Sequence, residues 1–127
     1  MAPRYFTVQE ANDLLPTIVP LMDQLLERRA RVVAARKEIG GIIEDLHSNV
    51  GGATASQLVR DFAAIERLMA KIQSYGCVVK DMNTGLLDFL AERNGREVYL
   101  CWRHGEPRVA FYHELHTGFN GRRPLEE

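Results

Sequence analysis

Two long stretches of the chain repeat apolar residues at alternating steps of three and four, which limits the fold more than any other feature. The repeating residues of the first stretch are Ile18, Met22, Leu25, Val32, Ile39, Ile43 and Leu46. Those of the second stretch are Leu58, Phe62, Ile65, Met69 and Ile72. A spacing of about 3.5 residues is typical of a helix that packs lengthwise along another helix, as in a coiled coil. The sequence therefore predicts two long helices that pack against each other.

Signals at the start of the first stretch place its N-terminal end. Thr7 and Glu10 have the spacing of a capping box, which predicts that a helix begins directly after Thr7. Pro16 and Pro20 each remove an amide donor and crowd the preceding helical turn. We therefore expect a short first helix that ends near Leu14 or Leu15, with a kink or a restart at Pro16.

A glycine-rich segment at residues 48–52 ends the first long helix. The second helix is expected from about Thr54 to Tyr75, and Gly76 follows it as a residue that can close a helix in the left-handed conformation. Long helices joined by a short turn pack antiparallel. The pattern therefore predicts a long antiparallel helical hairpin.

After Gly76 the apolar pattern changes to period two, and residues that favour β-strands become frequent. Strands are expected at residues 77–81, 86–91, 96–103 and 108–114. Asn94 and Gly95 both tolerate positive φ, so this pair predicts a tight hairpin between the second and third strands. The predicted sheet is an antiparallel meander of three to four strands, followed by a packed loop at residues 117–127.

At 127 residues the chain is long enough for one core, so we expect a single α+β domain over residues 1–127. Residues 1–76 form the helical hairpin scaffold, and residues 77–127 form the β-meander and the C-terminal loop with the candidate site. A strand of seven residues spans about 23 Å and a helix of 25 residues about 37 Å, so the helices should extend beyond the sheet. The simplest partner for the extending part is a second copy, which predicts a homodimer through the helices.

Charge and composition limit the partners. The formal net charge is −1, which disfavours nucleic acid as a partner. No apolar run approaches the ~20 residues that a membrane span needs, and no signal peptide is visible, so we expect no membrane partner. Cys77 and Cys101 have no CxxC spacing and are expected as reduced thiols, which predicts a cytoplasmic location. Six arginines between residues 93 and 123 suit a small anion.

The predicted strands contain one acidic residue in an apolar setting. Asp88 lies between Leu87 and Phe89 and must face away from both. A carboxylate in such a strand is costly unless it is paired or hydrated, and Arg103 is the expected partner across the hairpin. The pair is either a structural ion pair or part of an anchored polar site. Arg122, in the glycine-rich tail, is expected to return to this cluster as a clamp for a carboxylate or an anion.

His113 and His116 have the spacing of an HxxH motif. On a helix this spacing places both rings on one face, whereas on a strand it places them on opposite faces. Candidate metal ligands are His113, His116 and Glu106, with Asp88 or Cys101 as further donors for zinc or iron. Alternatively, His113 bonds to backbone or to a carboxylate, and His116 is a solvated loop residue. Cys101 would be a nucleophile only beside a base in an electropositive site.

Several short motifs resemble a known family. They lie at residues 85–89, 100–103, 105–106, 112–114, 118–119 and 121–122, and near the N-terminus at 5–7, 10–12 and 15–16. The chain resembles, over nearly its whole length, the small prokaryotic proteins catalogued as domain of unknown function 2203. The resemblance implies a prokaryotic cytosolic protein without an established activity. That family often has tryptophan at the position of Tyr112, and His116 lies outside its pattern.

The sequence thus predicts a small-ligand or metal-binding protein with a polar site on its C-terminal β unit. The residues leave open whether the site is catalytic. The candidate ligand-binding residues are Asp88, Arg103, Glu106, His113 and Arg122. The alternative is a non-catalytic protein–protein interaction module that acts through the helical hairpin. The first hypothesis expects these side chains to converge, and the second expects an apolar strip on the helices.

Overall fold

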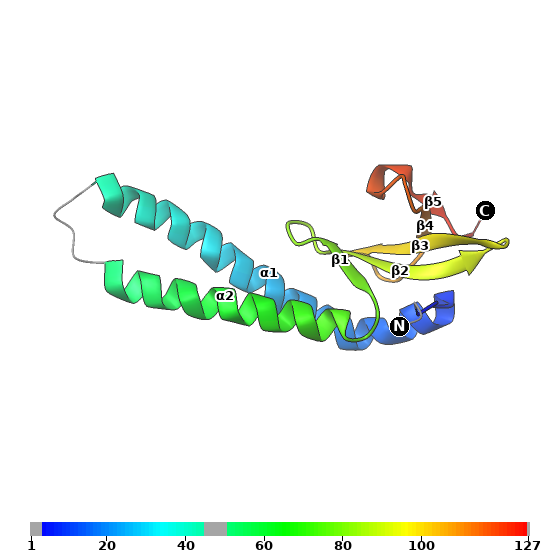
Figure 1. Ribbon diagram of the computed structural model, residues 1–127, viewed down its shortest axis with the longest axis horizontal. Helices are drawn as coiled ribbons and strands as arrows, with labels where there is room; N and C mark the ends of the chain where they lie inside the picture. The colour runs from blue at the N-terminus through cyan, green and yellow to red at the C-terminus, as the bar shows by residue number, and fades with distance from the viewer. Residues whose placement is uncertain (1–3, 45–50, 127) are drawn as a thin grey trace.

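The described residues form two α-helices, one 3-10 helix and an antiparallel sheet of five strands (Figure 1). The computed structural model describes residues 4–44 and 51–126, and side chains at 4–37 and 55–126. The elements are α1 (Val8–Glu44), α2 (Gly51–Gln73), β1 (Val78–Asp81), β2 (Leu86–Arg93), β3 (Arg96–Arg103), β4 (Phe111–Glu114), the 3-10 helix η1 (Phe119–Gly121) and β5 (Arg123–Pro124). The predicted α+β class is confirmed.

The N-terminal end of α1 is the predicted capping box. Thr7 Oγ1 accepts a hydrogen bond from the Glu10 amide at 3.0 Å, and Glu10 Oε1 accepts one from the Thr7 amide at 2.9 Å. The predicted interruption is wrong, because α1 continues through Pro16 and Pro20 to Glu44. The fixed φ of proline is compatible with a helix. The buried side chains of this segment pack into the core, and this packing outweighs the lost amide bonds.

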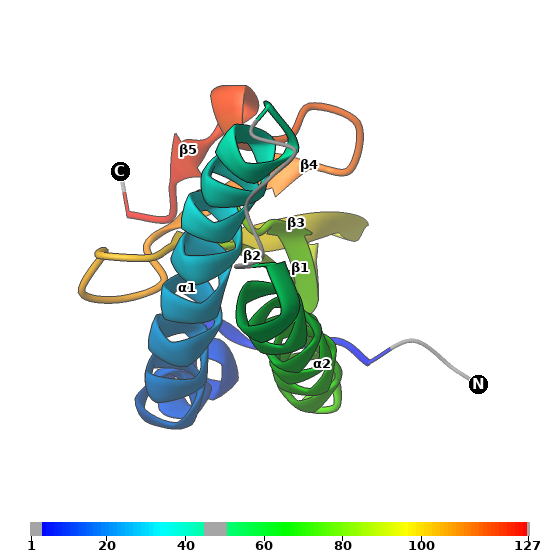
Figure 2. The same cartoon turned by 90° about the vertical axis from the view of Figure 1, so that its left-hand side faces the viewer.

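The two helices lie side by side and run in opposite directions (Figures 1 and 2). Of the residues expected to form the turn, 48–50 lie outside the described residues, and Gly51 and Gly52 begin α2, earlier than expected. Gly76 closes the end of α2 with φ 104°, as predicted.

The buried face of α2 differs from the predicted stripe, because it includes Asp61, Ala64 and Leu68. Phe62 is 49% exposed, whereas the neighbouring Asp61 is buried. Arg28 of α1 donates to Asp61 Oδ1 at 2.9 Å, and Gln57 donates to the same oxygen at 3.1 Å. Asp61 can be buried because these donors satisfy its carboxylate.

The strands follow one another in the order β1-β2-β3-β4-β5, which confirms an antiparallel meander. Asn94 and Gly95 form the predicted two-residue turn with φ 55° and 79°. The sheet has five strands instead of three to four, because residues 123–124 of the tail pair with β4. The predicted start of the fourth strand at residue 108 is wrong. The backbone of Val109 bonds to the Asn12 side chain of α1, and β4 begins only at Phe111.

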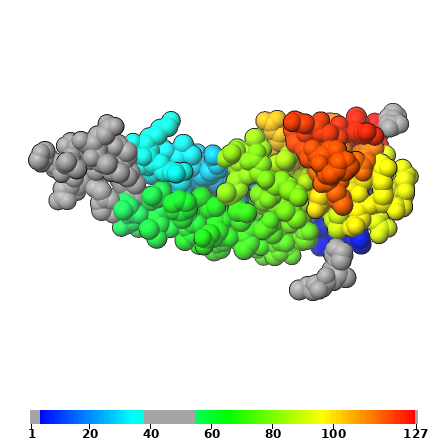
Figure 3. Space-filling model, turned by 45° about the horizontal axis from the view of Figure 1, so that its top comes forward, coloured from blue at the N-terminus to red at the C-terminus, as the bar shows by residue number. Residues whose placement is uncertain are grey.

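The two faces of the sheet have different neighbours. The inner face packs against the N-terminal half of α1 and the end of α2, and it carries the buried side chains of Leu87, Phe89, Leu100, Trp102 and Tyr112. On the other side, which we call the outer face, lies η1 (Figure 1). Both helices continue beyond the sheet, which makes the molecule elongated (Figures 1 and 3). Among the described residues, neither helix has the length and apolar content to cross a membrane.

Candidate metal centre

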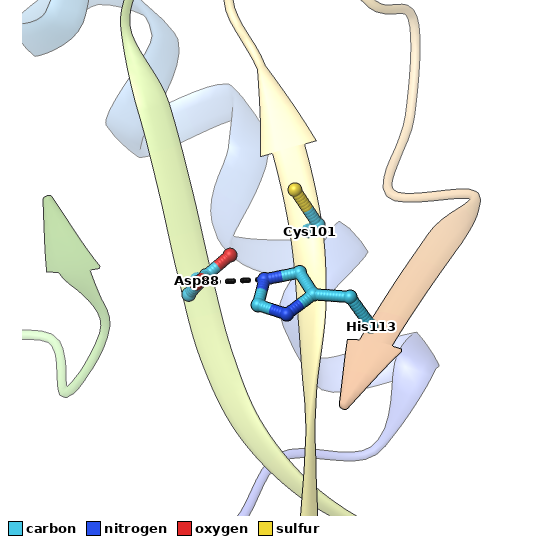
Figure 4. Close-up of side chains that lie close together, drawn as sticks. All are labelled: Asp88, Cys101 and His113. Atoms are coloured by element: carbon cyan, nitrogen blue, oxygen red, sulfur yellow. Dashed lines mark hydrogen bonds and ion pairs between the residues drawn. The ribbon is translucent and has the colours of Figure 1, made fainter. Parts of the chain in front are cut away.

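Three neighbouring strands bring three potential metal ligands together on the outer face. Asp88 of β2 is the cross-strand partner of Cys101 in β3. His113 of β4 is the cross-strand partner of Tyr99, two residues from Cys101 on the same face. Side chains alternate between the faces of a strand, so all three point away from the inner core. Figure 4 shows Asp88 and His113 pointing toward each other, with Cys101 beside them on the strand between.

The cluster is compact and closed to solvent. The exposed fractions of Asp88, Cys101 and His113 are 1%, 0% and 2%. One nitrogen, one sulfur and one oxygen, each from a different residue, lie within 4.8 Å of one another. Among the described residues, these three form the one group of at least three potential ligands this close together.

Both ring nitrogens of His113 have hydrogen-bond partners. Nδ1 lies 2.7 Å from the backbone oxygen of Glu114, and Nε2 lies 2.9 Å from Asp88 Oδ2. A carbonyl oxygen only accepts, so Nδ1 must carry a proton. One further proton is then shared between Nε2 and Asp88. The arrangement fixes the tautomer and aims Nε2 into the cluster.

The carboxyl group of Asp88 is incompletely satisfied. Its Oδ1 is buried and makes no hydrogen bond of good geometry among the described residues, although the Cys101 thiol lies close enough to lower the pKa of Asp88. Burial raises the pKa of Asp88, although the positive charges of His113 and Lys80 oppose this effect. A buried carboxyl oxygen without a partner is rare in native proteins, and it is a common sign of a functional site.

Cys101 is a buried free thiol. Burial, with a smaller effect from the Asp88 charge, raises the pKa of Cys101 to about 12. No ring nitrogen of His113 is left to deprotonate the thiol, because Asp88 and Glu114 occupy both. The arrangement therefore gives no support to Cys101 as a nucleophile. A thiol of this kind ionises readily only when it binds a metal.

A second polar cluster lies beside the first. Arg122 donates from Nη2 to both carboxylate oxygens of Glu106 at 2.8 Å, and its guanidinium stacks on Phe111 at 4.0 Å. Phe111 is the cross-strand partner of Cys101, so Arg122 covers the outer face next to the thiol. Arg122 thus returns to the sheet, where it binds the Glu106 carboxylate and not Asp88.

Two other candidate residues lie apart from the Asp88–Cys101–His113 cluster. The predicted pair of Asp88 and Arg103 is wrong, because His113 binds Asp88 and the exposed Arg103 side chain lies 5.7 Å from the Phe119 ring. His116 is exposed in the turn after β4, so the structure does not place it with His113. Neither His116 nor Glu106 belongs to the ligand group.

As metal ligands, Asp88 and Cys101 were expected only as donors additional to His113, His116 and Glu106. Strand alternation already predicted that Asp88 lies on the face of the sheet opposite to Leu87 and Phe89. It also predicted that Cys101 shares a face with Tyr99. The missing information was the register of β4, because residues 104–110 between β3 and β4 are irregular.

The fold and the cluster together define an α+β protein with a buried Asp–Cys–His group on the outer face of a five-stranded antiparallel meander. The sequence profile of the family described as "Uncharacterized conserved protein (DUF2203)" matches residues 4–125. The chain belongs to this family, as the resemblance of its motifs predicted. A search of curated proteins and a search of solved structures gave no match.

Proposed function

We propose that the protein binds a divalent transition-metal ion, zinc in particular, through Asp88, Cys101 and His113. The observation that carries this proposal is the convergence of a carboxylate oxygen, a thiol sulfur and an imidazole nitrogen within 4.8 Å. Zinc prefers ligands of these kinds in tetrahedral sites. Iron sites of the common type need a second histidine, which this cluster lacks, so zinc suits the donor set better.

The surroundings of His113 support the proposal. Histidines that bind metals usually donate the other ring N–H to a carbonyl or a carboxylate, and Nδ1 of His113 points at the Glu114 carbonyl. The ligand atoms of a tetrahedral zinc site lie about 3.4 Å apart. A zinc ion would therefore need Asp88 Oδ2 and His113 Nε2 to separate only slightly from their present 2.9 Å.

Three protein ligands leave one position of a tetrahedral site for water or a substrate. Zinc enzymes use this arrangement to lower the pKa of bound water or to polarise a carbonyl group. A catalytic role of this kind would also require the outer face to open, because Asp88, Cys101 and His113 are closed to solvent. A cytoplasmic location fits as well, because both cysteines are free thiols that a reducing compartment preserves.

The test is a titration of chelator-treated protein with Co²⁺ and then with Zn²⁺. We expect one ion per chain, a thiolate-to-cobalt absorption band, and displacement of Co²⁺ by Zn²⁺. Cys101→Ser should abolish the thiolate band, and His113→Ala should weaken binding at least about 100-fold, because each removes a direct ligand.

The chain offers matched controls for both substitutions. Cys77→Ser removes the other buried thiol, and His116→Ala removes the exposed histidine of the same motif. Both variants should bind cobalt like the wild type. If the folded wild type takes up no stoichiometric metal, or if the control variants lose it equally, the proposal fails.

A second candidate function is self-association through an antiparallel helical hairpin. One observation favours it: Val59 and Phe62, three residues apart on α2, are 68% and 49% exposed. Residues at this spacing share a helix face. We propose that a second copy covers this face, which would also account for the part of the helices that extends beyond the sheet.

A further inference from the structure

We propose that the outer face also binds a small oxyanion, a carboxylate or a phosphate group, through Arg103. A cavity of about 170 Å³ lies there, lined by Asp81, Thr84, Leu86, Arg103 and Phe119. It is large enough for about five water molecules, at about 30 Å³ each. A phosphate ion or a short dicarboxylate fits within this volume.

The position of this cavity places it next to the candidate metal centre. Leu86 and Arg103 are cross-strand partners, and Asp88 and Cys101 are the next such pair on the same face. Two residues along a strand correspond to about 7 Å. An anion bound by Arg103 would therefore lie beside the cluster without entering it, because Asp88, Cys101 and His113 are closed to solvent and do not line the cavity. The anion site does not depend on the zinc proposal.

Arg103 has the properties of an anion-binding residue. Among the described residues, no carboxylate lies within ion-pair distance of its guanidinium, whereas Arg122 nearby is bound to Glu106. The ring of Phe119 lies 5.7 Å from the Arg103 guanidinium, within cation–π range. A planar guanidinium binds carboxylate and phosphate groups through two parallel hydrogen bonds.

Asp81, the acidic residue of the cavity, is already engaged. Its Oδ1 accepts a hydrogen bond from the Asn83 amide at 2.8 Å, and its Oδ2 accepts one from the Thr84 hydroxyl at 3.2 Å. These local donors reduce its repulsion of an anion. The cavity thus contains the Arg103 guanidinium, which has no ion-pair partner among the described residues. It also contains the Asp81 carboxylate, which accepts hydrogen bonds from Asn83 and Thr84 in its own turn.

The experiment measures binding of inorganic phosphate and of malonate to the full chain by NMR titration at constant ionic strength. We expect saturable shifts at residues 84–86 and 103 for at least one of the two, which tells a phosphate site from a carboxylate site. Arg103→Gln should weaken binding at least about tenfold, because it removes the charged donors. Arg123→Gln, an exposed arginine outside the cavity, should leave binding unchanged.

The titration is performed on chelator-treated protein and on zinc-loaded protein. Binding to metal-free protein that depends on Arg103 supports the anion site even if the zinc proposal fails. If zinc binds but neither anion saturates, the anion proposal alone is wrong. Anion binding that survives Arg103→Gln, or that Arg123→Gln weakens equally, also overturns it.

Discussion

At the scale of single residues, the most informative group is the carboxyl of Asp88. It is buried between strands, its Oδ2 bonds to His113, and its Oδ1 makes no hydrogen bond of good geometry among the described residues. A group that served stability alone would be better replaced by an apolar side chain. Proteins keep such groups where binding or catalysis needs them, and stability is often lower as a result.

This reasoning predicts an unequal effect of Asp88→Asn on stability and on metal binding. The asparagine amide can donate to His113 Nε2 while Nδ1 keeps its bond to Glu114, so the hydrogen bond is preserved without a charge. Urea unfolding of the metal-free variant should give a free energy within about 1 kcal/mol of the wild type, or higher. Zinc binding should be lost. A decrease of more than about 3 kcal/mol would identify a structural ion pair instead.

The sequence was sufficient to predict which way Asp88 faces, because alternation in a strand is strict. It was insufficient to predict the partner. Arg103 and His113 are both plausible partners by charge, and the choice depends on the register of β4. That register depends on the bonds between Asn12 and Val109, residues separated by 97 positions, which no local pattern reveals.

At the scale of elements, the contact between α1 and α2 contains a buried charge. Asp61 of α2 accepts hydrogen bonds from Arg28 and Gln57, and Arg31 lies 3.9 Å away. The hydrogen bond from Arg28 lowers the pKa of Asp61, with the Gln57 bond acting in the same direction against burial. An interaction with the charged form stabilises the fold only while that form persists.

Asp61→Asn should therefore destabilise the protein in a pH-dependent way. At neutral pH we expect a loss of about 1–2 kcal/mol, near the lower limit for bonds to charged groups because Arg28 is partly exposed. The folded pKa of Asp61 is the lower one, so its stabilisation is present above the usual value of 3.8 and is lost as pH falls through the folded value.

The measurement is urea unfolding of both proteins between neutral and acidic pH. Asp13→Asn, which changes an exposed carboxylate of α1, is the control and should have little effect at any pH. A difference between wild type and Asp61→Asn that stays constant into acid would contradict the assigned ion pair.

The ends of helices and strands were predictable where a short sequence motif marks them. The capping box, the Asn94-Gly95 turn and the closing Gly76 all occur where the sequence places them. The interruption predicted at Pro16 and Pro20 is wrong because the free-energy cost of a proline in the helix is smaller than the free energy gained when α1 packs on the sheet. β5 has two residues, too few for a recognisable period.

At the scale of the whole molecule, the sheet and the N-terminal half of α1 share the core, and both helices continue beyond it (Figure 1). This arrangement separates the candidate metal centre, on the outer face, from the exposed part of α2. The two proposed functions therefore use different surfaces and can be tested independently.

Phe62→Asp tests self-association through the helices. If a second copy covers Phe62, the wild type should sediment as a dimer, and the variant should dissociate with a constant at least about tenfold higher, because a charge enters an apolar interface. Leu115→Asp, which changes a residue 47% exposed in the turn after β4, is the control. A wild type that is monomeric at all concentrations would refute the dimer.

The central claim, a zinc site at Asp88, Cys101 and His113, is tested most directly by anomalous X-ray diffraction. Crystals of zinc-loaded protein would be measured on both sides of the zinc absorption edge. We predict one strong anomalous peak per chain, about 2.0–2.3 Å from an oxygen of Asp88, the sulfur of Cys101 and Nε2 of His113. A map with no peak between these three side chains, while Asp88 and His113 remain hydrogen-bonded, would contradict the claim.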